Sequence, residues 1–239
     1  VGAKWRGGLG TVLFKDNSVV EEQNNADSAR GGGLFVDLNS TVTITDTDFT
    51  GNSVTSEDIG GQTPNEIYGG GAAYFREGTT VTVTRGTVSG NTITEGDGAG
   101  FAIRGGMLTL TDTVFDSNVA TDTQNDDENA RGGGLYVEYA TVQGTNVTFN
   151  ANQAFRDGGN ETSGGGGFYN RGGTVTFTDS TFTNNDGRDG GAFYNDTRLG
   201  VVNIVGGTFT GNFARTNHGG MFIATSGSVT NICQGDRKS

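Results

Sequence analysis

The chain has 239 residues, of which 44 are Gly and only 1 is Pro, and the glycines come in clusters without the every-third spacing of collagen. The net charge of -12, with no basic stripe to offset it, repels phosphate backbones, so we expect no nucleic-acid partner. No run of about 18 apolar residues occurs, so we expect no membrane-spanning helix.

One pattern recurs seven times along the chain. An aromatic residue or a valine stands three residues before an asparagine, and a glycine cluster followed by apolar residues comes next. A repeat of roughly 24 to 39 residues that runs end to end is typical of a solenoid, in which each unit buries its apolar face against its neighbours. We therefore expect one domain over residues 1–239, with repeats from about 10 to 230 and terminal segments at 1–9 and 231–239. The asparagines, which we expect to stack as a structural ladder, are Asn17, Asn52, Asn91, Asn118, Asn152, Asn185 and Asn212.

The first element of each repeat is a short apolar stretch after the glycine cluster, as at 34–36 and 135–137. Strand side chains alternate between faces, so the first and third residues are expected to point inward and the middle residue outward. We interpret the aromatic residues at this middle position as an exposed ladder that stacks on sugar rings or binds a protein, the plainer alternative being cross-strand stacking that stabilises the sheet. They are Phe35, Tyr74, Tyr136, Tyr169 and Tyr194.

The second element alternates threonine with aliphatic residues, as at 41–45 and 80–84, which predicts a strand with its threonines facing outward. The third element is a short strand that opens at the aromatic residue of the Phe-x-x-Asn pair and ends at its asparagine. Three short strands per turn, with no helical period, predict an all-β parallel β-helix of about seven rungs. The glycines are expected at corners that need positive φ or close backbone approach.

The segment between each asparagine and the next glycine cluster varies in length, and we predict that the long ones are polar loops on one edge of the rod. One of them is strongly acidic, and its carboxylates could hold a hard cation such as Ca²⁺. The alternative is solvated charge that keeps the stacked sheets soluble. We expect no other cofactor, and the residues of this candidate cation loop are Asp122, Asp126, Asp127 and Glu128.

Candidate catalytic residues are sparse. A β-helical lyase needs a basic residue, and Arg30, Arg131 and Arg188 lie close to one corner, where pairing with loop carboxylates is the simpler interpretation. A hydrolase needs converging carboxylates, and three aspartates recur just after the threonine strand, where a turn residue is the simpler interpretation. They are Asp46, Asp112 and Asp179. We therefore name no catalytic residue and leave the metal ligands unknown.

The repeats resemble those of a known family. Phe49-Thr50-Gly51-Asn52 and Gly190-Gly191-Ala192-Phe193 are similar to the Phe-x-x-Asn and Gly-Gly-x-apolar motifs of the chlamydial polymorphic outer membrane proteins, and more broadly to the right-handed parallel β-helix superfamily. The resemblance covers about residues 10 to 230 and implies a right-handed β-helix that is secreted or displayed at a cell surface. Some members of the superfamily adhere to cells, while others are polysaccharide lyases, hydrolases or epimerases.

We therefore expect an exported, non-enzymatic structural or adhesive protein, secreted or at a cell surface, that binds protein or glycan partners and could contact another domain or chain end to end. The alternative is a carbohydrate-active β-helix, either a lyase or an epimerase. A lesser alternative is ice binding, because Thr-x-Thr arrays on flat solenoid faces resemble those of ice-binding proteins, although this array is broken at 141–145 and 201–205. His218 and Cys233 are each the sole residue of their type, and sequons occur at Asn39, Asn146, Asn160 and Asn195.

Overall fold

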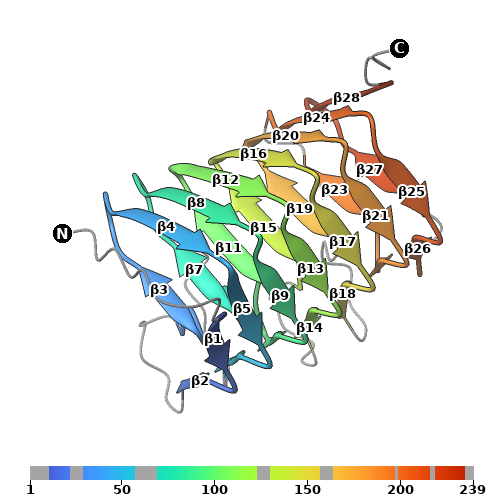
Figure 1. Ribbon diagram of the computed structural model, residues 1–239. Helices are drawn as coiled ribbons and strands as arrows, with labels where there is room; N and C mark the ends of the chain where they lie inside the picture. Colours follow the sequence, from blue (N-terminus) through green and yellow to red (C-terminus); the bar gives the residue numbers. More distant parts are fainter. Residues whose placement is uncertain are drawn as a thin grey trace.

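The chain forms a parallel β-solenoid (Figure 1). The computed structural model describes residues 11–21, 29–56, 69–122, 130–156, 164–196, 199–215 and 219–234. Within these ranges it has 28 strands and no helix, and they form four parallel sheets of seven strands each. No helix in these ranges is long and apolar enough to cross a membrane. The predicted all-β solenoid of about seven rungs is confirmed, but each complete rung has four strands, where three were expected.

The first two sheets contain the apolar triplets and the threonine strands. The tyrosine sheet consists of β3 (Leu34–Val36), β7 (Ala73–Phe75), β11 (Phe101–Arg104), β15 (Leu135–Glu138), β19 (Phe168–Arg171), β23 (Phe193–Asn195) and β27 (Phe222–Ala224). The threonine sheet consists of β4 (Thr41–Thr45), β8 (Thr80–Thr84), β12 (Met107–Thr111), β16 (Thr141–Thr145), β20 (Thr174–Thr178), β24 (Val201–Val205) and β28 (Val229–Cys233). Each strand pairs in parallel with its equivalent in the next repeat, so equivalent residues lie over one another.

The other two sheets lie before and after the asparagine of each repeat. The phenylalanine sheet consists of β1 (Val12–Lys15), β5 (Thr47–Thr50), β9 (Thr87–Ser89), β13 (Val114–Asp116), β17 (Thr148–Asn150), β21 (Thr181–Thr183) and β25 (Thr208–Thr210). The fourth sheet consists of β2 (Ser18–Glu21), β6 (Ser53–Ser56), β10 (Thr92–Thr94), β14 (Val119–Asp122), β18 (Gln153–Arg156), β22 (Asp186–Gly187) and β26 (Phe213–Ala214). The fourth sheet was missed because its strands begin the segments that we predicted to be loops.

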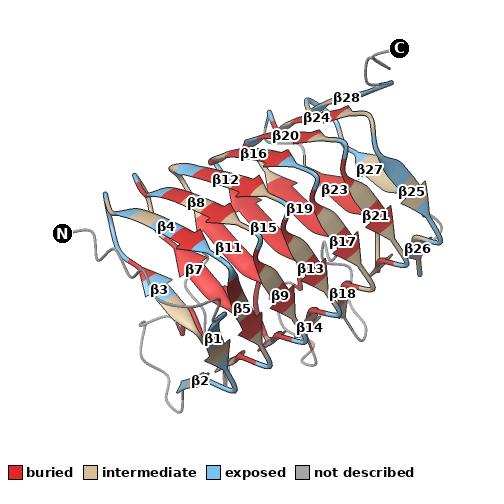
Figure 2. Cartoon of the chain, in the orientation of Figure 1, coloured by how far each residue is buried: buried red, intermediate tan, exposed pale blue. Residues whose placement is uncertain are grey.

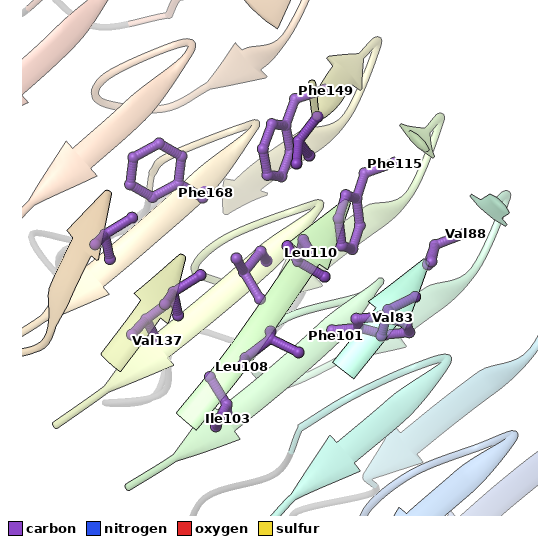
Figure 3. Close-up of a cluster of buried hydrophobic side chains, with 14 of the residues drawn as sticks. Val83, Val88, Phe101, Ile103, Leu108, Leu110, Phe115, Val137, Phe149 and Phe168 are labelled. Carbon is purple, nitrogen blue, oxygen red and sulfur yellow. The ribbon is translucent and has the colours of Figure 1, made fainter. Parts of the chain in front are cut away.

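The interior contains two apolar columns. Figure 2 shows that buried residues recur on the strands of successive repeats. The larger one lies among the tyrosine, threonine and phenylalanine sheets, and Figure 3 shows its rings and aliphatic side chains pointing toward one another. Phe149 stacks between Phe115 and Phe182, with ring centroids 4.9 and 5.1 Å apart. The smaller column is made of valine, isoleucine and alanine side chains from the fourth sheet and of alanines beside the glycine clusters. Small side chains let those two segments approach closely.

The corners between strands use left-handed backbone conformations. Gly132 has a φ of 65°, and a Cβ at this position would lie only 2.3 Å from the carbonyl oxygen of Leu135. The corner after the first six threonine-sheet strands is left-handed too, and aspartate takes it at Asp46, Asp112 and Asp179 with φ of 50°, 49° and 50°. Aspartate tolerates this conformation better than most non-glycine residues, so these recurring aspartates are corner residues.

Gly144 makes room in the core for a large neighbour. It faces inward between Leu110 and Phe177, and a Cβ there would lie 2.3 Å from a ring atom of Phe177. We expect G144V to cost about 3 kcal/mol through overpacking, and F177V about 2 to 3 kcal/mol through the cavity that it leaves. The double variant G144V/F177V should lose about 1 to 3 kcal/mol less than the sum, because each change compensates the other. Urea unfolding of the four proteins measures this coupling.

A distant substitution supplies the control for this cycle. Val81 is fully buried three strands away in β8, so V81A and F177V should be additive within about 0.5 kcal/mol. Additive losses for G144V and F177V as well would contradict the proposed fit between these two positions.

Candidate functional site

The seven asparagines lie in one line along the solenoid axis. In each internal step the side-chain oxygen of one asparagine accepts hydrogen bonds from the backbone and side-chain amides of the asparagine before it. For Asn118, Oδ1 accepts from the N and Nδ2 of Asn91 at 3.1 and 2.9 Å, while Nδ2 donates to Asn152 Oδ1 and to the carbonyl oxygen of Val88, both at 2.8 Å. The five internal asparagines of the line are fully buried. This ladder holds the corner between the phenylalanine sheet and the fourth sheet.

The aromatic ladder exists in register but is not the exposed surface that we predicted. Its tyrosines are directed away from the main core and form a separate cluster with Ala102, which interrupts the ladder in β11. Phe35 is 43% exposed, whereas the tyrosines are buried, with 1% exposure at Tyr74, Tyr136 and Tyr169 and 9% at Tyr194. The rings of Tyr169 and Tyr194 stack at 4.9 Å. The expectation that these tyrosines are exposed is therefore wrong, because an outward-pointing side chain is not always a solvent-exposed one. Binding by this ladder stays a prediction.

A buried ion pair lies against the tyrosines. Asp97 and Arg131 take the same register position in adjacent repeats, so they lie side by side. The Arg131 guanidinium contacts Asp97 through two hydrogen bonds, with Nε–Oδ1 at 2.9 Å and Nη2–Oδ2 at 2.5 Å. It also lies over the rings of Tyr136 and Tyr169, 5.1 and 5.4 Å from their centroids. Arg30 takes the same register position two repeats earlier than Asp97 and lies over the ring of Tyr74.

The pKa values of this cluster follow from its burial. Burial raises the pKa of the Asp97 carboxyl group, and the contact with Arg131 opposes that rise. Burial alone would lower the pKa of Arg131, but the Asp97 carboxylate raises it well above its usual value. The raised pKa keeps the Arg131 guanidinium protonated, and its Nε and Nη2 donate to the Asp97 carboxyl group. Burial also raises the pKa of Tyr194 to about 12.

A chain of alternating charges runs along the end of the tyrosine-sheet strands. Glu138 is 3% exposed and is bridged by two arginines from adjacent strands, Arg104 at 3.3 Å and Arg171 at 3.1 Å. Arg104 also contacts Glu77 at 3.3 Å, and Arg76 continues the chain to Asp37 at 2.9 Å. Arg76 joins Asp37 to Glu77, Arg104 joins Glu77 to Glu138, and Arg171 contacts Glu138 from the next repeat, so the chain links successive rungs.

The remaining catalytic candidates do not converge. Arg30 and Arg131 share one register position, and in the repeat that contains Arg188 this position is taken by the next residue, Asp189. The corner aspartates contact neighbouring repeats: Asp46 pairs with Arg85 at 2.6 and 2.8 Å, and Asp112 accepts a 2.7 Å hydrogen bond from Asn146. Their recurrence thus reflects corner geometry and contacts between rungs.

A second, shorter asparagine ladder was not anticipated. Asn170 and Asn195 face inward at the third position of their triplets, where earlier repeats have valine, phenylalanine or isoleucine. Asn170 Nδ2 donates to Asn195 Oδ1 at 3.0 Å, and Asn195 Nδ2 donates to the carbonyl oxygen of Val229 at 2.9 Å. The signal in the sequence was asparagine at an inward strand position in two successive repeats.

Much of the predicted cation loop lies outside the described residues. Asp122 ends β14 and is 1% exposed, while Asp126, Asp127 and Glu128 are in the range 123–129, which the structure does not describe. In the described ranges no group of three or more His, Cys, Asp or Glu side chains could hold a metal ion. Calcium binding by this loop stays a prediction. His218 also lies outside the described ranges, and Cys233 is an exposed free thiol at the end of β28.

The outer side of the threonine sheet is a regular surface. Side chains at the first, third and fifth strand positions form three in-register columns, and all of them are exposed or half-buried. The fifth position holds an unbroken run of threonines over five strands, Thr45, Thr84, Thr111, Thr145 and Thr178. The other columns are interrupted, for example by Met107 and Gln143.

Comparison with protein-family models, curated proteins and solved structures finds no match to this chain.

Proposed function

We propose that this chain is an exported, non-enzymatic structural or adhesive β-solenoid, at a cell surface or in an extracellular assembly, that binds a protein or glycan partner through the outer side of its threonine sheet. We also propose that it belongs to the right-handed parallel β-helix superfamily, with repeats of the polymorphic outer membrane protein type. The stacked asparagines and phenylalanines of its Phe-x-x-Asn units support this kinship.

The observation that carries the binding proposal is the five-strand threonine column together with the two columns beside it. Adjacent strands lie about 4.8 Å apart, so the column presents hydroxyl groups at a fixed, short repeat. Threonine is stiff at χ1, and the strands that carry this column are paired along their length, so little conformational entropy is lost when a partner binds. A surface of this kind suits a partner with regularly spaced hydroxyl or amide groups, such as an extended polysaccharide.

Removing hydroxyls from this column tests the proposal. The triple variant T84V/T111V/T145V keeps the β-branched shape and removes three adjacent hydroxyls. The unaltered protein is first screened on an array of immobilised polysaccharides and extracellular-matrix proteins. We expect the triple variant to bind the ligands found in that screen at least about 10-fold more weakly than the unaltered protein does.

A matched variant on another sheet is the control. Thr148, Thr181 and Thr208 form a three-strand column on the outer side of the phenylalanine sheet, so T148V/T181V/T208V removes the same groups elsewhere. It should bind as the unaltered protein does. Equal binding by both triple variants would contradict the choice of surface, and cleavage of uronate polymers by the protein would contradict the non-enzymatic assignment.

Ice binding is a second candidate function, and the same unbroken threonine column favours it. A thermal-hysteresis measurement on the unaltered protein tests it directly. Hysteresis that is lost in T84V/T111V/T145V and kept in T148V/T181V/T208V would replace the adhesive proposal, whereas no hysteresis in the unaltered protein would exclude this candidate.

A further inference from the structure

Three Asn-x-Ser/Thr sequons have their asparagine within the described ranges, at Asn39, Asn146 and Asn195. The first two asparagines are exposed and the third is buried. The fourth, at Asn160, lies outside those ranges. In cells that attach N-linked glycans, transfer to a sequon generally precedes folding of the segment. The folded structure then decides which modified chains can reach the native state.

Asn39 is on an exposed corner between β3 and β4, with a φ of 56°. Its backbone amide donates to the carbonyl oxygen of Glu77 at 3.1 Å, whereas its side-chain amide takes part in no hydrogen bond within the described part of the chain. Thr41, which completes the sequon, is exposed as well. A substituent on Nδ2 of this exposed residue would therefore break no hydrogen bond.

Asn146 is on an exposed corner between β16 and β17, with a φ of 53°. Its Nδ2 donates a 2.7 Å hydrogen bond to Asp112 Oδ1. A glycosylated asparagine is a secondary amide that keeps one N–H, so the hydrogen bond to Asp112 can persist beside a glycan.

Asn195 is fully buried, and its amide is completely engaged. Nδ2 donates to the carbonyl oxygens of Gly200 and Val229 at 3.2 and 2.9 Å and to the Thr230 hydroxyl at 3.0 Å, while Oδ1 accepts from Asn170. A glycan on this nitrogen would remove a buried donor and would have no space, so a chain modified here could not form this part of the solenoid.

We propose that Asn39 and Asn146 are N-glycosylation sites of this protein and that Asn195 stays unmodified; this rests on the export that the proposed function includes. In the transfer, Nδ2 forms a bond to C1 of the sugar of a lipid-diphosphate-linked oligosaccharide. The bond between C1 and the diphosphate oxygen breaks, the lipid diphosphate leaves, and the amide gives up one proton. The two corners lie at opposite ends of threonine-sheet strands, Asn39 before β4 and Asn146 after β16, so the two glycans would flank the threonine surface.

Secretion of the full chain from a eukaryotic cell line, followed by glycopeptide mass spectrometry, tests the proposal. All proteins in this experiment carry N160Q, so that every glycan detected is attached to a sequon whose asparagine the structure describes. We expect glycans at Asn39 and Asn146 and none at Asn195, with one glycan lost in N39Q and one in N146Q.

A gain-of-site variant extends the test. Asp179 takes the position after Asn146 in the same corner column, is exposed and has a φ of 50°, and Ser180 and Thr181 follow it. D179N therefore completes a new sequon on an equivalent corner and should add one glycan.

A glycan on Asn195 of the folded, secreted protein would overturn the proposal. So would unmodified Asn39 and Asn146, whether or not D179N gains a glycan. The polysaccharide-binding test is run on unglycosylated protein from bacteria, so a failure of the threonine surface there is distinct from a failure of these sites.

Discussion

Replacing Asn118 with leucine should destabilise the solenoid by about 3 to 5 kcal/mol. Leucine has the same number and branching of side-chain heavy atoms as asparagine but offers neither acceptor nor donor. N118L therefore leaves the buried backbone and side-chain amides of Asn91 without the acceptor that they now share, and it removes the donor to the carbonyl oxygen of Val88. A buried donor that loses its partner costs about 1 to 3 kcal/mol. Equilibrium unfolding in guanidinium chloride, followed by circular dichroism, measures the loss.

The end of the same ladder supplies the control. Asn17 is exposed and donates through its backbone and side-chain amides to Asn52 Oδ1, at 3.1 and 2.8 Å. N17L keeps the backbone donor and removes one solvent-accessible hydrogen bond, so it should cost about 1 kcal/mol or less. Equal losses for N118L and N17L would show that burial of the ladder does not govern its contribution.

The sequence predicted the parts of this fold in which one residue type recurs at one position. The Phe-x-x-Asn pairs and the Thr-x-Thr strands each have a period and an alternation that specify inward and outward side chains, and the structure has both arrangements. The fourth strand carries a weaker signal. In each repeat a single small or aliphatic residue, such as Val54, Ile93 or Ala120, stands two residues after the asparagine, and the variable segment that follows hides it.

The candidate site was less predictable because its key contacts join residues of different repeats that share no motif. Asp97 and Arg131 occupy the same position in neighbouring repeats, where other repeats have arginine, glycine or aspartate. Only the register of the glycine clusters brings this carboxylate and this guanidinium together. The exposure of the tyrosines was predicted wrongly for a related reason: alternation in a strand gives the side on which a residue lies, not what covers that side.

Arg131 should be among the most sensitive positions outside the core. R131M retains an apolar stem but removes the guanidinium, so the Asp97 carboxylate, whose side chain is 5% exposed, loses its bidentate partner. Leaving one charge of a buried pair uncompensated costs about 3 to 5 kcal/mol, and the contacts with the rings of Tyr136 and Tyr169 are lost as well. D97N/R131M removes both charges and should recover most of that loss.

The pH dependence separates a charge effect from a packing effect. Burial already raises the pKa of Asp97, and loss of Arg131 removes the interaction that opposes this rise. When a carboxyl group has a higher pKa in the folded than in the unfolded protein, the protein loses stability as the pH rises from the unfolded-state pKa to the folded-state pKa. The deficit of R131M should therefore be largest at neutral pH and shrink as the pH is lowered toward about 4, whereas the deficit of D97N/R131M should stay constant.

Arg85 and Asp46 form the matched exposed pair. Their contact has the same bidentate form, at 2.6 and 2.8 Å, but both side chains are more than half exposed. Water solvates the Asp46 carboxylate when its partner is removed, so R85M should have nearly the unfolding free energy of the unaltered protein when both are measured by urea titration beside R131M and D97N/R131M. If R131M were no more harmful than R85M, or if its deficit did not change between neutral pH and about pH 4, the buried pair would have no special role in linking these two repeats.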